Sequence, residues 1–190
     1  VVVTGLGAVS PLGIGVPALW DGLIAGRSGV RRIQHFDTDN LTVKIAAEVP
    51  DFDPKAFMDP KSVRRMDRFA HFAVAATREA IADAVLEITD ENRDRIAVMM
   101  NTGGGGIPTI ESNVVTMATS GPSRVSPFLI PMFAPNMASS QVSITFGVKG
   151  PTLTMVAACA AGVQAFVDAV HLLERGDADV VVAGGTEAGI

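Results

Sequence analysis

The chain has 190 residues, of which 48% are hydrophobic and 18% charged, and its formal net charge is −5. This composition is typical of a folded α/β protein and excludes both an intrinsically disordered chain and, with a single cysteine, a disulfide-built one. The negative charge also disfavours nucleic acid as a general partner, because phosphate binding needs a basic surface.

The apolar segments and the two ends of the chain bear on where the protein works. The longest apolar stretch, residues 153–173, is interrupted by Gln164 and Asp168, so no segment is predicted to span a membrane. No signal peptide is recognisable and a lone cysteine is typical of a reducing compartment, so we expect a cytoplasmic protein. The chain begins and ends beside strand-like runs, which indicates one lobe of a larger molecule.

The first half of the chain alternates between strand-like and helix-like segments. Residues 1–4 form a β-branched run that predicts a strand, and residues 16–25 predict a helix with Pro17 in its opening turn. Residues 43–49 have β character. The apolar residues of 66–84 recur at the i, i+3, i+4, i+7 spacing of a helix packed on one face.

The second half continues this alternation. The expected elements are strand 96–100, helix 107–120, helix 136–146, strand 152–158, helix 160–175 and strand 178–183. Continuous apolar strands joined by helices are typical of a parallel sheet that is buried on both faces. We therefore predict an α/β fold with a mixed, mostly parallel sheet and helices on both of its faces.

The single cysteine, Cys159, lies where the strand-like run 152–158 meets a helix that opens with Ala160-Ala-Gly162. A thiol at a helix N-terminus faces unpaired backbone N–H groups and the positive end of the helix dipole, which favour the thiolate. The small neighbours leave room for an incoming carbonyl, and the backbone N–H of Cys159 can donate to an oxyanion. Cys159 is the best candidate nucleophile, with a buried structural cysteine as the alternative.

Two glycine-rich segments and the three histidines give weaker signals. Residues 4–10 resemble a dinucleotide-binding fingerprint, but Ser10 occupies the third glycine position and no acidic residue follows at the required distance. Residues 103–106 are all glycine without the Lys-Ser/Thr of a phosphate loop, so we expect them to allow close backbone approach to a substrate or partner. With one cysteine and three histidines, we expect no metal site and no bound cofactor.

A basic cluster stands out in this acidic chain. Lys61, Arg64, Arg65 and Arg68 recur at helical spacing, which predicts four positive charges on one side of a helix start. Such a patch can attract an acidic protein or a phosphate group. An ordinary solvated helix face is the alternative.

Seven motifs occur in a fixed order through all 190 residues. They are VVVTGLGAVSPLG at 1–13, HFD at 35–37, RMD at 65–67, SPF at 126–128, GP at 150–151, ACAAG at 158–162 and GDADVVVAGG at 176–185. Together they resemble the N-terminal half of β-ketoacyl-[acyl-carrier-protein] synthases, most of all the synthase II type of bacterial fatty-acid synthesis. The resemblance implies a thiolase-like fold of two similar α/β halves, with residues 1–190 as the N-terminal lobe and the C-terminal lobe absent from this chain.

The resemblance also implies a reaction. Cys159 would accept the acyl chain from an acyl carrier protein as a thioester, and its backbone N–H would contribute to the oxyanion hole. Malonyl carrier protein would then be decarboxylated, and its carbanion would attack that thioester to give a 3-oxoacyl product two carbons longer. Because family members draw two histidines and a lysine from the second half, these 190 residues alone are expected to be inactive. The substrates are carried on phosphopantetheine, so no cofactor is implied.

Further residues acquire roles through the same resemblance. Lys61, Arg64 and Arg65 fall where synthase II enzymes contact their acidic carrier protein, and Arg124 falls near a second such contact. Gly104 stands where these enzymes commonly carry a bulky residue that gates the acyl pocket. Substrate length is therefore expected to differ from that of the housekeeping enzyme.

The resemblance predicts an assembly and leaves alternatives open. The strand at 153–157 would pair with its two-fold mate in a homodimer. A polyketide ketosynthase shares this architecture, and a non-catalytic chain-length factor has the same fold but lacks the cysteine that is present here as Cys159. A thiolase that acts on coenzyme A substrates is a third alternative, which the basic cluster and the motif set disfavour.

Overall fold

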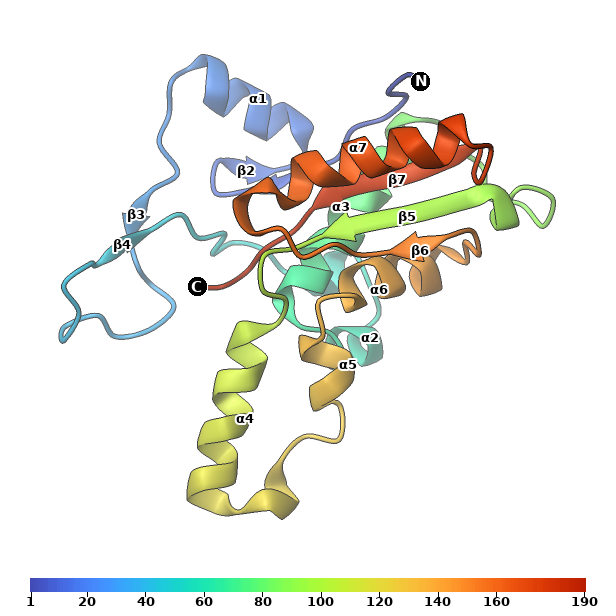
Figure 1. Cartoon of the computed structure of the whole chain (residues 1–190). Coiled ribbons are helices and arrows are strands. Elements are labelled where there is room, and N and C mark those ends of the chain that lie inside the picture. The colour runs from blue at the N-terminus through green and yellow to red at the C-terminus, as the bar shows by residue number, and fades with distance from the viewer.

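A computed structural model describes all residues 1–190 (Figure 1). Its centre is a three-stranded sheet of β5 (Ile96–Asn101), β6 (Thr152–Leu153) and β7 (Val180–Gly185), in the order β6–β5–β7. Both pairings are parallel, and β5 and β7 stay in register along their whole length. Antiparallel pairs occur only in two small separate sheets, so the prediction of a mostly parallel sheet is confirmed.

The two faces of the sheet are covered by different helices, as Figure 1 shows. On one face lies α7 (Ala161–Glu174), and on the other lies α6 (Met137–Phe146) with α3 (Arg68–Asp83) packed beside it. The side chains of β5 alternate between the two layers: Ile96, Val98 and Met100 join the α3–α6 cluster, and Ala97 and Met99 join the α7 cluster. Every residue of β5 is buried, which is why its first five residues, Ile96–Met100, are all apolar.

The remaining elements surround this core. They are β1 (Val9–Ser10), β2 (Gly13–Ile14), α1 (Val16–Ile24), β3 (Arg31–Arg32), β4 (Ile45–Ala46), α2 (Pro60–Val63), α4 (Ile107–Ser120) and α5 (Leu129–Phe133), with 3-10 turns η1 (Pro54–Ala56), η2 (Arg93–Arg95), η3 (Pro122–Arg124) and η4 (Ala158–Ala160). In Figure 1, α4 runs away from the sheet and α5 returns toward it, so the two helices form a projecting arm. None of the helices combines the length and apolar character that a membrane span needs.

The five predicted helices are confirmed to within one or two residues at their ends. The longest, α3, starts at Arg68 because Asp67 caps it: the Asp67 Oδ1 accepts a hydrogen bond from the Phe69 N–H at 3.3 Å. Glycine in the left-handed conformation ends α6, where Gly147 has φ 71°.

Two strand predictions are wrong. Residues 1–4 form no strand, and Val2 is 81% exposed. The backbone that follows makes hydrogen bonds to side chains of α3 rather than to another strand. The Leu6 N–H donates to the Asp83 carboxylate and the Ala8 N–H to the Glu79 carboxylate, at 2.9 Å each. Strand β6 ends at Leu153 rather than at residue 158, and only an isolated bridge between Thr102 and Val156 continues the pairing.

Candidate active site

Cys159 lies in the 3-10 turn η4, directly before α7, and its side chain is exposed. Ala158 before it has φ 46°, a left-handed conformation that costs an alanine roughly 1–2 kcal/mol. The N-cap of α7 is Ala160, which has no side-chain acceptor, and the first N–H of the helix, that of Ala161, donates to the Ala158 carbonyl oxygen within the turn η4. The predicted position of Cys159 before a helix is confirmed, but irregular chain and the turn η4, rather than a strand, lead into that helix. The alternative of a buried cysteine is wrong.

The thiol opens onto a cavity of about 570 Å³ between the ends of β5 and β7 and the start of α7. The cavity is lined, besides Cys159, by Thr102, Gly103, Gly104, Ile107, Ala158, Ala161, Gly162, Gly185, Thr186, Glu187 and Gly189. Most of these residues are small, and Ile107 is the one large apolar side chain among them. The small lining leaves space for a thioester beside the sulfur.

Glu187, which the sequence reasoning missed, fixes the glycine turn beside Cys159. Its Oε2 accepts hydrogen bonds from the N–H of Gly103 at 2.8 Å, from the N–H of Gly104 at 3.1 Å and from the hydroxyl of Thr102 at 3.2 Å. A Cβ at Gly103 would lie 2.7 Å from that same oxygen. Position 103 therefore needs glycine because the Glu187 carboxylate of the same chain approaches the backbone closely there, whereas the sequence predicted close approach to a substrate or partner.

Asn101 is the second residue that the sequence reasoning missed. It ends β5, it is fully buried, and its side-chain amide bonds to backbone on both sides of Cys159, at Met155 and at Ala161. An asparagine at the end of an apolar strand, one residue before a glycine run, was the signal in the sequence.

The whole chain, residues 1–190, matches the family model described as β-ketoacyl synthase, N-terminal domain. The chain belongs to the β-ketoacyl synthase family. Among curated relatives it is 47% identical over 190 residues to the 3-oxoacyl-[acyl-carrier-protein] synthase 2 of Synechocystis sp., covering 100% of the chain and 46% of the relative. It is 46% identical to the Coxiella burnetii synthase 2, with 98% and 45% covered. The chain thus spans about half the length of the curated relatives it matches.

Solved structures agree with this assignment. The ishigamide ketosynthase/chain length factor superposes with a TM-score of 0.91 at 31% identity, over 98% of this chain and 47% of that one. A β-ketoacyl synthase from Burkholderia phymatum gives a TM-score of 0.78 at 27% identity, over 93% and 44%. The predicted family and its thiolase-like α/β fold are therefore confirmed.

Gly104 of this synthase domain lies on the wall of the Cys159 cavity. A Cβ at this position would lie 2.7 Å from Cδ1 and 3.3 Å from Cγ1 of Ile107. Ile107 thus fills the space that a side chain at position 104 would take. The predicted gate position borders the cavity, and its role as a gate stays a prediction.

None of the three histidines lines the Cys159 cavity. His35 and His171 are exposed, on the loop after β3 and near the end of α7. His71 is buried in α3, where its Nε2 lies 3.0 Å from the Val63 carbonyl oxygen, and burial lowers the pKa of its imidazole. This domain therefore brings no histidine of its own to the sulfur.

The basic residues do not form one helical face. The short helix α2 ends at Val63 and α3 begins at Arg68, so the predicted row of four charges is interrupted. Arg68 turns inward: it donates to the Val49 carbonyl and lies over the ring of Phe72, 5.0 Å from its centroid. The placement of Arg68 on the exposed patch is wrong, because its guanidinium is used inside the fold.

The other three cations remain available. Lys61, Arg64 and Arg65 are exposed around the end of α2, and the Arg65 guanidinium lies 5.0 Å from the ring centroid of Phe128 before α5. Arg124 is also exposed and ends the turn η3 that follows α4. In Figure 1 the end of α4 lies at the tip of the arm and α2 near its base, so these cations belong to two separate surfaces.

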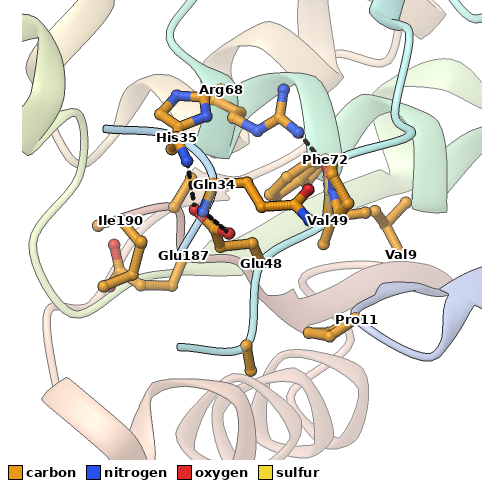
Figure 2. Close-up of a pocket in the computed structure, with 14 residues that line it drawn as sticks. Val9, Pro11, Gln34, His35, Glu48, Val49, Arg68, Phe72, Glu187 and Ile190 are labelled. Atoms are coloured by element: carbon orange, nitrogen blue, oxygen red, sulfur yellow. Dashed lines mark hydrogen bonds between the residues drawn. The ribbon is translucent and has the colours of Figure 1, made fainter. Parts of the chain in front are cut away.

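A second cavity of about 470 Å³ lies between the chain around residues 34–50 and residues 187–190 (Figure 2). One of its two carboxylates, that of Glu48, is committed to the fold. The Glu48 carboxylate accepts hydrogen bonds from the N–H groups of Gln34 at 2.9 Å and His35 at 3.1 Å, as the dashed lines in Figure 2 show. No cysteine, serine or threonine lines this cavity, so the Cys159 cavity is the candidate active site.

Proposed function

We propose that this chain is the nucleophile-bearing half of a 3-oxoacyl-[acyl-carrier-protein] synthase that elongates fatty acids. One observation carries the proposal: an exposed cysteine at the N-terminus of α7 opens onto a cavity lined by small residues. The identity of 46–47% to two curated synthases of this name supports it.

The geometry supports a two-step acyl transfer. In the first step the Cys159 thiolate attacks the carbonyl of an acyl thioester on the carrier protein, and the phosphopantetheine thiol leaves with a proton. The Cys159 backbone N–H and the positive end of the α7 dipole stabilise the negative charge that develops on the carbonyl oxygen. In the second step malonyl carrier protein loses carbon dioxide, and the resulting carbanion attacks the Cys159 thioester and releases the thiolate.

The groups that assist decarboxylation belong, in this proposal, to a C-terminal lobe of the same fold that packs on residues 1–190. Two observations support this arrangement. No histidine lines the Cys159 cavity, and the outer face of α7 exposes Val163, Phe166 and Val167. Exposed apolar side chains on one helix face favour a surface that further protein covers. We propose that residues 1–190 are inactive without that lobe.

The acyl carrier protein, in this proposal, docks on the exposed cations. Lys61, Arg64 and Arg65 surround the end of α2, and Arg124 supplies a second contact at the tip of the arm. Positive charge raises the association rate with an acidic protein and fixes its orientation. The phosphopantetheine arm then carries the acyl and malonyl thioesters to Cys159, and we propose that the protein needs no other cofactor.

We further propose a homodimer in the cytoplasm. The edge strand β6 and the residues after it expose Leu153, Met155 and Val156, and an open strand edge is self-complementary under a two-fold axis. Beside this edge lies a cavity of about 310 Å³ that Asp168 also lines. The Oδ2 of Asp168 is buried without a hydrogen-bond partner, which a donor from a second copy would satisfy.

A polyketide ketosynthase is the second candidate. The TM-score of 0.91 to the ishigamide ketosynthase/chain length factor, at 31% identity, favours it. A non-catalytic subunit similar to a chain-length factor is disfavoured by the exposed Cys159. The product of the assay below separates the three.

The test uses the full-length protein. Incubation with an acyl carrier protein that bears a C8 to C16 chain should add that acyl group to Cys159, detected by peptide mass spectrometry. Malonyl carrier protein should then release a single 3-oxoacyl product two carbons longer, and repeated elongation without reduction would indicate the polyketide alternative. No acyl adduct on Cys159, with a Cys159→Ala variant as the blank, would contradict both catalytic functions.

A further inference from the structure

We propose that Asn101 is a positioning residue that holds the segment carrying Cys159 at both of its ends. The Asn101 side chain has no solvent exposure. Its Oδ1 accepts a hydrogen bond from the N–H of Met155 at 2.8 Å, and its Nδ2 donates to the carbonyl oxygen of Ala161 at 3.1 Å. Met155 precedes Cys159 and Ala161 follows it, so one buried amide spans the reactive turn.

The backbone of Asn101 extends this link to the third side of the cavity. Asn101 pairs with Gly185 at the end of β7, and its carbonyl oxygen accepts a hydrogen bond from the Thr186 N–H at 2.9 Å. The end of β7, the segment after β6 and the first turn of α7 are therefore all tied to one residue. These are the three segments that surround the thiol.

The main-chain hydrogen bonds around the same turn are longer. The Thr102 N–H lies 3.4 Å from the Met155 carbonyl oxygen, and the Ala157 N–H lies 3.4 Å from the Thr102 carbonyl oxygen. Hydrogen bonds of this length are weak, whereas bonds of 2.8 and 3.1 Å are normal. The side chain of Asn101 therefore makes the stronger attachment of the turn to the sheet.

Asparagine is the residue type that this position requires. The site presents one backbone donor and one backbone acceptor, and an amide matches both with a single flat group. Aspartate would offer an acceptor only, and its charge would face the Ala161 carbonyl. Leucine would leave both backbone groups buried without partners.

The functional consequence rests on the proposed function of Cys159. A turn that is loosened at either end places the sulfur and the Cys159 N–H less accurately against the incoming carbonyl. The loss should therefore fall on kcat for acyl transfer rather than on KM for the carrier protein.

The experiment compares Asn101→Leu and Asn101→Asp with wild type in the full-length protein. The matched control is Asn113→Asp on α4, because the Asn113 side chain also donates to a carbonyl, that of Thr109, and accepts from an N–H, that of Ser126, at 2.8 Å each. The first readout is the rate at which iodoacetamide alkylates Cys159 between pH 5 and 9, measured on the folded fraction. The second is kcat and KM for acyl transfer.

We expect Asn101→Leu to lower the alkylation rate about tenfold and kcat about 10²-fold, with KM unchanged. Asn101→Asp should behave alike at pH 9 but approach the wild-type rate at pH 5, since a protonated carboxyl again offers one donor and one acceptor. Asn113→Asp should follow wild type at every pH.

A folded Asn101→Leu variant with wild-type alkylation and kcat would overturn the inference. If that variant does not fold, the alkylation rate of Asn101→Asp relative to wild type decides. A relative rate that is independent of pH and equal to that of Asn113→Asp would overturn the inference. Wild-type protein whose Cys159 alkylates normally but condenses no substrate would contradict the proposed function alone.

Discussion

Gly162 and Gly185 pack backbone against backbone, where the first turn of α7 crosses the end of β7. A Cβ at Gly185 would lie 2.9 Å from the Cα of Gly162, whereas a Cβ at Gly162 would lie 3.8 Å from the Cα of Gly185. The contact is asymmetric: only one of the two glycines lacks room for a side chain. Because Cys159 directly precedes this turn, the contact also sets how close the reactive turn lies to the sheet.

This asymmetry predicts opposite results from the same substitution. Gly185→Ala should lower the free energy of unfolding by about 1–3 kcal/mol, because the new methyl group pushes α7 away from β7. Gly162→Ala should leave it unchanged or raise it by up to about 1 kcal/mol, because alanine favours a helix. Urea unfolding of both variants measures the difference, and equal losses would contradict the geometry.

The proposed docking surface around α2 predicts that charge reversal there selectively weakens binding of the carrier protein. The double variant Lys61→Glu and Arg64→Glu should raise KM for acyl carrier protein about tenfold or more. This KM should also vary less with salt concentration than that of wild type. KM for a small acyl-pantetheine thioester should not change, because that substrate does not reach α2. Arg27→Glu, an exposed position after α1, is the charge control. An equal rise of KM for both substrates would argue against docking at α2.

The cavity wall predicts a change in substrate length. Gly104→Ala should reduce kcat/KM for long acyl chains about tenfold and spare short ones, because the added methyl forces Ile107 Cδ1 to move within the cavity. The double variant Gly104→Ala with Ile107→Ala should restore the long substrates by returning that space. The test measures kcat/KM for acyl chains from C4 to C16. An equal loss of kcat/KM at every chain length would contradict a role of Gly104 in selecting chain length.

Buried His71 predicts that stability depends on pH. Burial lowers the pKa of this imidazole below the value of 6.5 expected in the unfolded chain, so the unfolded state binds the extra proton more readily. The contribution of His71 is therefore complete above pH 6.5, and stability falls as the pH drops below that value. His71→Gln should flatten this part of the profile, and His35→Gln, at an exposed position, should not. Thermal melts from pH 5 to 8 provide the test.

The exposed edge at β6 predicts a dimer that a single charge disrupts. Leu153→Lys should convert the full-length protein to a monomer, because a lysine on an edge strand opposes pairing with another strand. Val43→Lys, at an equally apolar and exposed site outside this edge, should leave the assembly intact. Sedimentation velocity distinguishes the two states, and a wild-type protein that is monomeric at micromolar concentration would contradict the dimer.

The helices could be predicted because residues close to each helix end determine where the helix begins and ends. Helix α4 begins after Gly106, with Pro108 in its first turn, and ends before Gly121, so its bounds agree with the prediction. The prediction that the basic cluster lies on one helix face was wrong for a reason that is also local. Both Asp59 and Asp67 cap helices, and two N-caps so close together indicate two helices rather than one.

The parts of the site that were missed depend on contacts between distant residues. Asn101 bonds to residues 54 and 60 positions away, and Glu187 bonds to a turn 83 and 84 positions away. No periodicity or spacing in the sequence indicates which residues so far apart will form hydrogen bonds. Cys159 could be found because the start of a helix beside small residues is a short-range pattern. The groups that hold it in place become visible only when the strands lie side by side.

The left-handed backbone at Ala158 has a final consequence for the reactive turn. Glycine at this position would relieve most of the strain of roughly 1–2 kcal/mol, and Ala158→Gly should therefore make the folded protein more stable in that respect. Glycine would also let the peptide before Cys159 rotate freely. Ala158 thus lowers the stability of the fold but restricts rotation of the peptide before Cys159. A mobile peptide there would let the sulfur move away from the substrate carbonyl.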